Sequence, residues 1–316
     1  MINLHPGQPE DPIRITLVTA DLSEEPSFEA LSYVWGHVSP RDHSPSILID
    51  DLRLNITESV HNALQVLRSL SSMKTLWVDQ ICVNQQDLVE RQHQVLLMAD
   101  VYQTATSVIV YLGQPTEQTE MDMQHLQLFL QRHNQGEDAP WSHIAIPDLE
   151  LSISRVLSKP WFKRIWTVQE AVLAQHIVML CGRYQIQWAA DLQTLRGLVF
   201  RIKSASISPM YRLSLRSASE LDWSPLLDIL ESQMRQAARR EGVVLHRNLL
   251  DVAFDFRQRN ASDPRDKYYA ILGIIEDNKG GSLSFAPNYA MSAEQVYEDF
   301  KAEIQRIGEI DTVPLQ

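Results

Sequence analysis

The sequence predicts an α/β fold with a mainly parallel sheet that carries insertions, followed by a helical C-terminal region. Before about residue 190, short apolar segments typical of buried strands alternate with segments of helical periodicity. After that point only helical patterns follow. The chain has 316 residues, of which 44% are hydrophobic, so it can bury a large core. We therefore expect an α/β core over residues 1–190 and a helical extension packed on it over residues 191–316.

Each strand is predicted from a short apolar or alternating segment that is bounded by turn residues. The segment 74–79 is apolar and ends in an acid, Asp79, which is typical of a buried parallel strand. Gly113 closes the segment 107–112 in a similar position. The expected strands are 13–18, 28–34, a hairpin of 46–49 and 52–54 that turns at Asp50 and Asp51, 74–79, 107–112, 176–181 and 184–188.

The helices are predicted from the spacing of apolar residues and from capping residues at their N-termini. Thr57 and Asp263 are the expected N-caps of two helices, and Pro264 follows Asp263 at the first helical position. Ser292 is the expected N-cap of a third helix, with Glu294 and Gln295 near the capping-box position. The expected helices are 57–70, 88–104, one around 121–132 within an insertion over 114–150, 161–174, one within 239–259, one within 264–275, and 292–307.

Composition and charge exclude several classes of function. The 40 acidic and 28 basic residues give a net charge of −12, and no basic run is interleaved with aromatics, so we expect no nucleic-acid partner. The two cysteines, Cys82 and Cys181, are too few for a disulfide scaffold and are typical of a reducing cytosol. The first residues lack the pattern of a signal peptide, and no apolar run is long enough to span a membrane. We expect a soluble, cytoplasmic protein.

The helix predicted over 161–174 carries the most informative pair of side chains. Trp166 and Glu170 are four residues apart and share one face beside an apolar stripe. The residues expected to face inward are Trp161, Ile165, Val168 and Val172. An acid next to an indole at a core boundary can have a perturbed pKa, and the indole can stack on an aromatic ligand. The alternative is that Glu170 pairs with Lys163 or Arg164 as part of the fold.

The sequence lacks the residue patterns of cysteine hydrolases, metal sites and glycine-rich phosphate loops. Cys82 precedes a helix, but no His and Asn or Asp partners accompany it as a cysteine hydrolase requires. No pair of histidines with an acid and no Cys-x-x-Cys pair predicts a metal site, and no glycine-rich phosphate loop occurs. Arg91 and His93 are predicted to be solvated helix residues. The alternating charges of residues 257–267 predict a salt-bridged junction between helices.

Several ordered sequence blocks resemble the fungal heterokaryon-incompatibility (HET) domain family. The resemblance covers most of residues 15–316. Its blocks are Phe-Glu-Ala-Leu-Ser-Tyr-Val-Trp-Gly at 28–36, Leu-Trp-Val-Asp-Gln-Ile-Cys-Val-Asn-Gln at 76–85, Glu-Arg-Gln-His-Gln-Val at 90–95, 98–113, 160–174, 263–273 and Asn288-Tyr289. The resemblance implies a role as an effector in fungal nonself recognition that ends in programmed cell death. It also implies a remote likeness to TIR domains, which have a flavodoxin-like fold and some of which hydrolyse NAD at a glutamate in a W-x-x-x-E helix.

The TIR-like resemblance implies a set of site residues. Residues 166–170 match the W-x-x-x-E pattern, so Glu170 is the expected catalytic residue. The residues expected to bind the nucleotide are Ser32, Tyr33, Trp35, Gly36, Asp79 and Trp166. Several of them follow strands, and ligands of open α/β sheets bind outside the carboxyl ends of strands. The alternatives stay open: Tyr33 and Trp35 in the core, Gly36 serving a turn with positive φ, and Asp79 capping the next helix.

Two classes of function follow from these residues. In the first, the protein hydrolyses the nicotinamide–ribose bond of NAD through Glu170, since one carboxylate can stabilise an oxocarbenium-like transition state. NAD or a related nucleotide is then a substrate, and no resident cofactor is expected. In the second, the protein is a non-enzymatic module that signals by oligomerisation. Both hypotheses expect association with further copies of the chain, and a protein partner in incompatibility signalling fits either. A hydrolase acting on another N-glycosidic bond is a third option.

Overall fold

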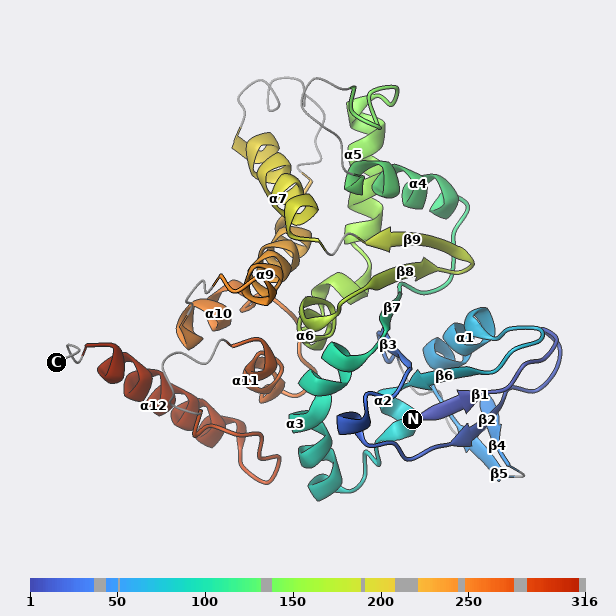
Figure 1. Cartoon of the computed structure of the whole chain (residues 1–316), viewed down its shortest axis with the longest axis horizontal. Helices are drawn as coiled ribbons and strands as arrows, with labels where there is room; N and C mark the ends of the chain where they lie inside the picture. The colour runs from blue at the N-terminus through green and yellow to red at the C-terminus, as the bar shows by residue number, and fades with distance from the viewer. Residues whose placement is uncertain are drawn as a thin grey trace.

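The strands of a computed structural model form one mixed sheet, and helices cover both of its faces (Figure 1). The structure describes residues 1–36, 44–50, 52–131, 138–188, 191–207, 221–243, 248–275 and 283–312. The described strands lie in the order β5-β4-β2-β1-β6-β3-β7-β8-β9. They are β1 Ile2–Leu4, β2 Arg14–Leu17, β3 Glu29–Tyr33, β4 Ser46–Ile49, β5 Leu52–Asn55, β6 Lys74–Trp77, β7 Ser107–Tyr111, β8 Ile177–Cys181 and β9 Tyr184–Trp188.

The centre of the sheet is parallel and its flanks are largely antiparallel. β6, β3, β7 and β8 pair in parallel, whereas β1 pairs antiparallel with both β2 and β6. The hairpins β4–β5 and β8–β9 end the sheet on its two sides. The prediction of a mainly parallel sheet thus holds for the four central strands. It is wrong for most of the flanks: β1 pairs antiparallel with β2 and β6, two-residue turns join the antiparallel hairpins β4–β5 and β8–β9, and only β2 and β4 pair in parallel there. A flavodoxin-like sheet is parallel in a different strand order.

The predicted strands all occur, and one strand was missed. β1 has only three residues, Ile2–Leu4, and its apolar–polar–apolar alternation is too short to predict a strand. Asp50, at the turn of the predicted hairpin, has φ of +52°. Asp51 lies outside the described residues. Gly182 turns the chain between β8 and β9 with φ of +54°, a conformation that glycine adopts without steric cost.

The described helices include four that were not predicted, α2, α5, α7 and α9. They are α1 Glu58–Leu67, α2 Asp79–Cys82, α3 Leu88–Thr104, α4 Thr119–Leu130, α5 Ile146–Leu157, α6 Trp166–Leu173, α7 Leu192–Ile207, α9 Ser224–Arg240, α10 Leu249–Asp255, α11 Asp266–Tyr269 and α12 Ala293–Thr312, with 3-10 turns η1 Leu22–Glu24, η2 Pro160–Lys163 and η3 Leu272–Ile274. In the part of the chain that the structure describes, no helix combines the length and apolarity needed to cross a bilayer.

Two of the three predicted caps are confirmed. The Thr57 hydroxyl accepts a hydrogen bond from the Val60 amide at the start of α1. Ser292 and Gln295 form the capping box, since each side chain accepts from the other residue's amide. The prediction for Asp263 is wrong, because α11 begins three residues later and Asp263 accepts instead from Arg265.

Residues after 190 form only helices and turns within the described ranges, as predicted. Helix α9 packs against both α6 and α7, so the helical region covers the core. A division at residue 190 into two domains stays a prediction.

Two hydrophobic cores lie on opposite faces of the sheet. Along β3, Ala30 belongs to the core that α3 and α6 cover, and Leu31 and Tyr33 belong to the core that α1 covers. The side chain of Ser32 therefore points to the face of α3 and α6, because successive residues of a strand alternate. This alternation places a buried polar group of the sheet directly against α6.

The segment predicted as one helix over 161–174 is divided at Arg164. η2 ends at Lys163, and residue 164 bridges to Asn260, with the Ile165 amide donating to the Asn260 carbonyl at 2.9 Å. The four residues predicted to face inward are buried. The predicted amphipathic character is wrong, since every residue of α6 is buried. α3 lies against α6, and α9 from the helical region covers it as well.

Gly273 lies where α3, α6 and the C-terminal region meet, and it provides a test of this packing. A Cβ atom there would lie 2.6 Å from Gln169 Oε1 and 2.7 Å from Ala99 Cβ. We expect Gly273→Ala to lower the free energy of unfolding by about 1–3 kcal/mol through overpacking. Gly197→Ala is the matched control, because no atom lies within 4 Å of its added Cβ in α7. It should stabilise by about 0.5–1 kcal/mol. Chemical unfolding of both variants measures the difference, and equal shifts would contradict this packing.

Candidate functional site

A buried hydroxyl joins the central sheet to α6. Ser32 Oγ on β3 donates a hydrogen bond to Glu170 Oε2 and accepts one from Trp161 Nε1 at 2.7 Å. Glu170 is only 2% exposed, and Ser32 is fully buried. The indole and the carboxylate thus share one hydroxyl, which satisfies both inside the core.

Burial changes the acidity of Glu170. Loss of solvation raises its pKa from 4.5 to about 7, because the charged form is disfavoured in the interior. The positive charge of Arg164 and the hydrogen bond from Ser32 oppose this shift, and Asp79 adds to it. The structural alternative was a pairing with Lys163 or Arg164. Arg164 does act on Glu170 through its charge, so this part of the alternative is supported.

Asp79 lies at the end of the neighbouring parallel strand and forms the first residue of α2. Its carboxylate accepts hydrogen bonds from Tyr33 Oη at 2.7 Å and from Trp35 Nε1 at 2.8 Å. It also accepts from the Gln80 amide at 2.8 Å. Burial raises the pKa of Tyr33 well above its usual range, and the charge of Asp79 and the Tyr33–Asp79 hydrogen bond add to this effect. The Asp79 carboxylate therefore holds the side chains of Tyr33 and Trp35 in position.

A pocket of about 630 Å³ opens beside this layer, a volume typical of small-molecule sites. Four of the predicted binding residues line it, namely Trp35, Gly36, Asp79 and Trp166. Ser32, Tyr33 and Glu170 are not among its lining residues and form the layer behind it. The other residues that line it are Val34, Trp77, Val83, Gln85, Arg91, Gln94, Val95, Met98, Pro160, Arg164, Asn260, Ala261, Ser262, Asp263, Asp266 and Tyr289.

Gly36 combines the two roles weighed for it. It lines the pocket and has φ of +70°, which serves the turn after β3. Trp166 is 8% exposed and lines the pocket one turn before Glu170. The two predicted tryptophans thus border the same cavity, and Trp35 is the more exposed of them, since Trp166 counts among the buried residues.

Arg164 is the cation of the inner wall. Its guanidinium donates to the Tyr33 carbonyl at 2.6 Å and lies 5.9 Å from the centre of the Trp35 ring. Burial by itself would lower the pKa of Arg164, but the charges of Glu170 and Asp79 raise it above its ordinary value. The guanidinium therefore stays charged beside two carboxylates. Sequence reasoning considered Arg164 only as a partner for Glu170 and missed its place in the pocket.

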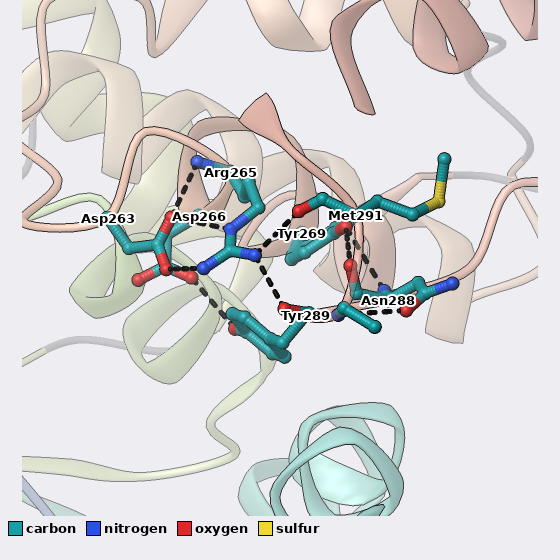
Figure 2. Close-up of polar contacts among 8 residues, drawn as sticks. Asp263, Arg265, Asp266, Tyr269, Asn288, Tyr289 and Met291 are labelled. Carbon is teal, nitrogen blue, oxygen red and sulfur yellow. Dashed lines mark hydrogen bonds and ion pairs between the residues drawn. The ribbon is translucent and has the colours of Figure 1, made fainter. Parts of the chain in front are cut away.

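The outer wall comes from the C-terminal region, whose pocket-lining residues include Asp263, Asp266 and Tyr289. Figure 2 shows the polar contacts that connect them. Asp266 accepts a hydrogen bond from Tyr289 Oη at 2.8 Å, and a hydrogen bond with Trp166 also lowers its pKa. Burial is the larger effect and raises the pKa of Asp266 overall. The Asp266–Trp166 contact connects the outer wall to α6. Neither Asp266 nor Tyr289 was predicted as a site residue.

An ion pair holds the loop that carries Tyr289. Arg265 binds Asp263 through two of its nitrogens, at 2.9 and 2.7 Å. The same guanidinium donates to the carbonyls of Tyr289 and Met291, both at 2.7 Å (Figure 2). Asp263 also lines the pocket. The charged segment 257–267 is thus a junction between helices, as predicted, and it also contributes a wall of the pocket.

Arg91 on α3 contacts the outer wall from the other side of the pocket. Its guanidinium carbon lies 3.8 Å from the centre of the Tyr289 ring, and the residue is half-buried and lines the pocket. The prediction of a solvated helix residue is therefore wrong for Arg91. It is confirmed for His93, which is exposed. The error arose because Tyr289 lies almost 200 residues further along the chain.

Comparison with known proteins finds a family match that includes the residues of the inner part of this site. Residues 28–170 match the family model described as heterokaryon incompatibility protein (HET). The chain carries a HET domain. Over 92% of its length it is also 28% identical to "Heterokaryon incompatibility protein 6, OR allele" of Neurospora crassa. The chain spans about half the length of that curated relative, 49%. No solved structure matches the chain.

The HET domain contains the inner wall of the pocket and the layer behind it. The matched residues run from the start of β3 to Glu170 and include Ser32, Asp79, Arg91 and Arg164. Asp266 and Tyr289 lie beyond the match. Among the described residues, no three His, Cys, Asp or Glu side chains cluster as metal ligands do. The pocket is therefore bordered by HET-domain residues on one side and by the helical region on the other.

The raised pKa of Glu170 predicts a specific pH dependence of stability. Its folded pKa, about 7, lies above its ordinary 4.5, so its contribution is fully present below about pH 4.5 and is lost as pH rises through 7. Glu170→Gln cannot titrate. We expect the free energy of unfolding of the wild type to fall relative to this variant by about 2 kcal/mol between pH 5 and pH 8.

Chemical unfolding at several pH values measures this difference. Glu10→Gln serves as the control, because Glu10 lies in an exposed loop. For that variant the difference from the wild type should not change over the same pH range. A Glu170→Gln difference that stays constant between pH 5 and pH 8 would show that Glu170 is already ionised in the folded protein at pH 5.

Proposed function

We propose that this chain is an effector of fungal nonself recognition whose HET domain signals programmed cell death by hydrolysing NAD or a related nucleotide. The HET domain and the incompatibility protein of Neurospora crassa support the incompatibility role. The TIR-like resemblance of residues 166–170 supports hydrolysis through Glu170. A cytoplasmic location and self-association belong to the same proposal.

The observation that carries the proposal is the pocket itself. Two tryptophans, Trp35 and Trp166, border it and offer aromatic surfaces for flat bases. Asp79 and Asp266 offer carboxylate oxygens that can accept hydrogen bonds from ribose hydroxyls. Its volume of about 630 Å³ lies within the range of sites for nucleotide-sized ligands.

The chemistry assigned to Glu170 is electrostatic. Cleavage of the bond between ribose C1′ and the nicotinamide nitrogen leaves positive charge on the sugar, and nicotinamide departs as a neutral molecule. Water then adds to C1′ and loses a proton, which gives ADP-ribose and nicotinamide. A carboxylate beside C1′ stabilises the charged transition state. Because Glu170 lies behind the pocket wall, it must exchange its hydrogen bond with Ser32 for contact with the ribose.

Release of nicotinamide from NAD, followed by chromatography at high protein concentration, tests this function. The wild type should release nicotinamide, and Glu170→Gln should reduce the rate about 100-fold or more, because it removes the charge at the reacting centre. Glu10→Gln, in an exposed loop, should match the wild type. Equal turnover by the wild type and by Glu170→Gln would exclude Glu170 from the mechanism.

One observation favours a second candidate, a non-enzymatic module that signals by oligomerisation. Glu170 is buried, shares a hydroxyl with Trp161 and belongs to a helix with every residue buried. In this function Glu170 stabilises the core, and the chain acts through its surfaces. Light scattering and a fungal cell-death assay separate the two. Self-association with full killing by a folded Glu170→Gln variant supports the module, and killing that is lost while self-association remains supports the enzyme.

A further inference from the structure

Two guanidinium groups from separate segments line the pocket. Arg164 lies between η2 and α6, and Arg91 lies on α3. Within the described ranges, neither makes an ion pair with a carboxylate. Glu170 and Asp79 act on Arg164 through their charges, and Arg91 acts on Asp263 and Asp266 in the same way, but none of these carboxylates is within ion-pair distance of either guanidinium.

The contacts that hold each arginine leave donors available. Arg164 donates one hydrogen bond, to the Tyr33 carbonyl, and a guanidinium has five N–H donors. Arg91 lies over the face of the Tyr289 ring, a contact that orients the guanidinium without an acid. Tyr289 is itself fixed by Asp266 and, through its carbonyl, by Arg265 (Figure 2). Both cations are therefore positioned by their surroundings.

The carboxylates of the pocket are engaged by other donors. Asp79 accepts from Tyr33 and Trp35, and Asp263 binds Arg265 through both of its oxygens. Asp266 accepts a hydrogen bond from Tyr289, and burial raises its pKa. Each of these carboxylates is thus hydrogen-bonded by other protein donors. Within the described ranges, Arg91 and Arg164 line the pocket and make no ion pair with any of them.

We infer that Arg91 and Arg164 bind phosphate oxygens, so that the pocket selects a nucleotide with a diphosphate over a nucleoside or a free base. Guanidinium groups match phosphate geometry and form charge-assisted, bidentate hydrogen bonds with it. Trp35 and Trp166 then lie beside the bases, and Asp79 lies beside a ribose. The inference rests on the proposed nucleotide site but does not require hydrolysis.

Titration calorimetry with ADP-ribose, adenosine and inorganic pyrophosphate tests the inference on the full chain. The wild type should bind ADP-ribose more tightly than adenosine, and pyrophosphate should compete with ADP-ribose. Arg91→Gln should weaken ADP-ribose binding about 10- to 100-fold, the loss expected for a charge-assisted hydrogen bond, and leave adenosine binding unchanged. Arg91→Lys should recover part of the affinity, since it keeps the charge and loses the bidentate geometry.

Arg14→Gln is the control, because Arg14 is an exposed arginine on β2, away from the pocket. It should bind ADP-ribose as the wild type does. Arg164→Gln should show the same selective loss as Arg91→Gln, and its thermal unfolding reports whether the buried layer stays intact. Wild-type affinity for ADP-ribose in both Arg91→Gln and Arg164→Gln would overturn the inference, and so would a wild type that binds no phosphate-bearing ligand or binds adenosine equally well.

The result is separable from the proposed hydrolysis. ADP-ribose binding that depends on Arg91, with no release of nicotinamide from NAD, would exclude the hydrolase and leave the phosphate site in place. Nicotinamide release that is unaffected by either arginine variant would exclude the phosphate site and leave the hydrolase.

Discussion

The hydroxyl of Ser32 is the contact on which the arrangement of this site depends. It has one proton to donate, and it donates to Glu170 while it accepts from Trp161. One strand of the sheet is thereby joined to both η2 and α6. The next residue, Tyr33, points to the opposite face and reaches Asp79 with its hydroxyl and Arg164 with its carbonyl. Two consecutive residues of β3 therefore place the acids and the arginine of the inner wall.

This arrangement brings opposite charges into a region of low solvation. Glu170 and Asp79 lie near Arg164, whose pKa they raise, and burial raises the pKa of Glu170 to about 7. Such a layer contributes little to stability in itself, because desolvation offsets the attraction. Its presence beside a cavity makes it a candidate functional site. Because a carboxylate that loses water needs other hydrogen-bond donors, Asp79, Asp263 and Asp266 are each bound by protein donors.

Much of the local structure could be predicted from the sequence, since it depends on neighbours in the chain. The strands, the Thr57 cap, the Ser292 capping box and the inward residues of 161–174 follow from spacing and residue type. Four residues of the cavity were predicted because they follow strands or match a motif. The full burial of α6 could not be predicted, because α9, more than 50 residues later, covers its outer side. The meeting of Arg91, Asp266 and Tyr289 in one pocket could not be predicted either, because these residues lie far apart in the sequence.

The cavity thus has two walls with different positions relative to the family match. The inner wall lies within residues 28–170, and the outer wall is carried by residues 260–289 beyond it. The outer wall is held by a local ion pair, Asp263 with Arg265, which needs no residue of the HET domain. A change at Asp263 or Arg265 would therefore alter the loop that carries Tyr289 and leave the hydrogen bonds among Ser32, Trp161 and Glu170 in place. Under the proposed function, the shape of the outer wall could then change while the buried layer around Glu170 stays the same.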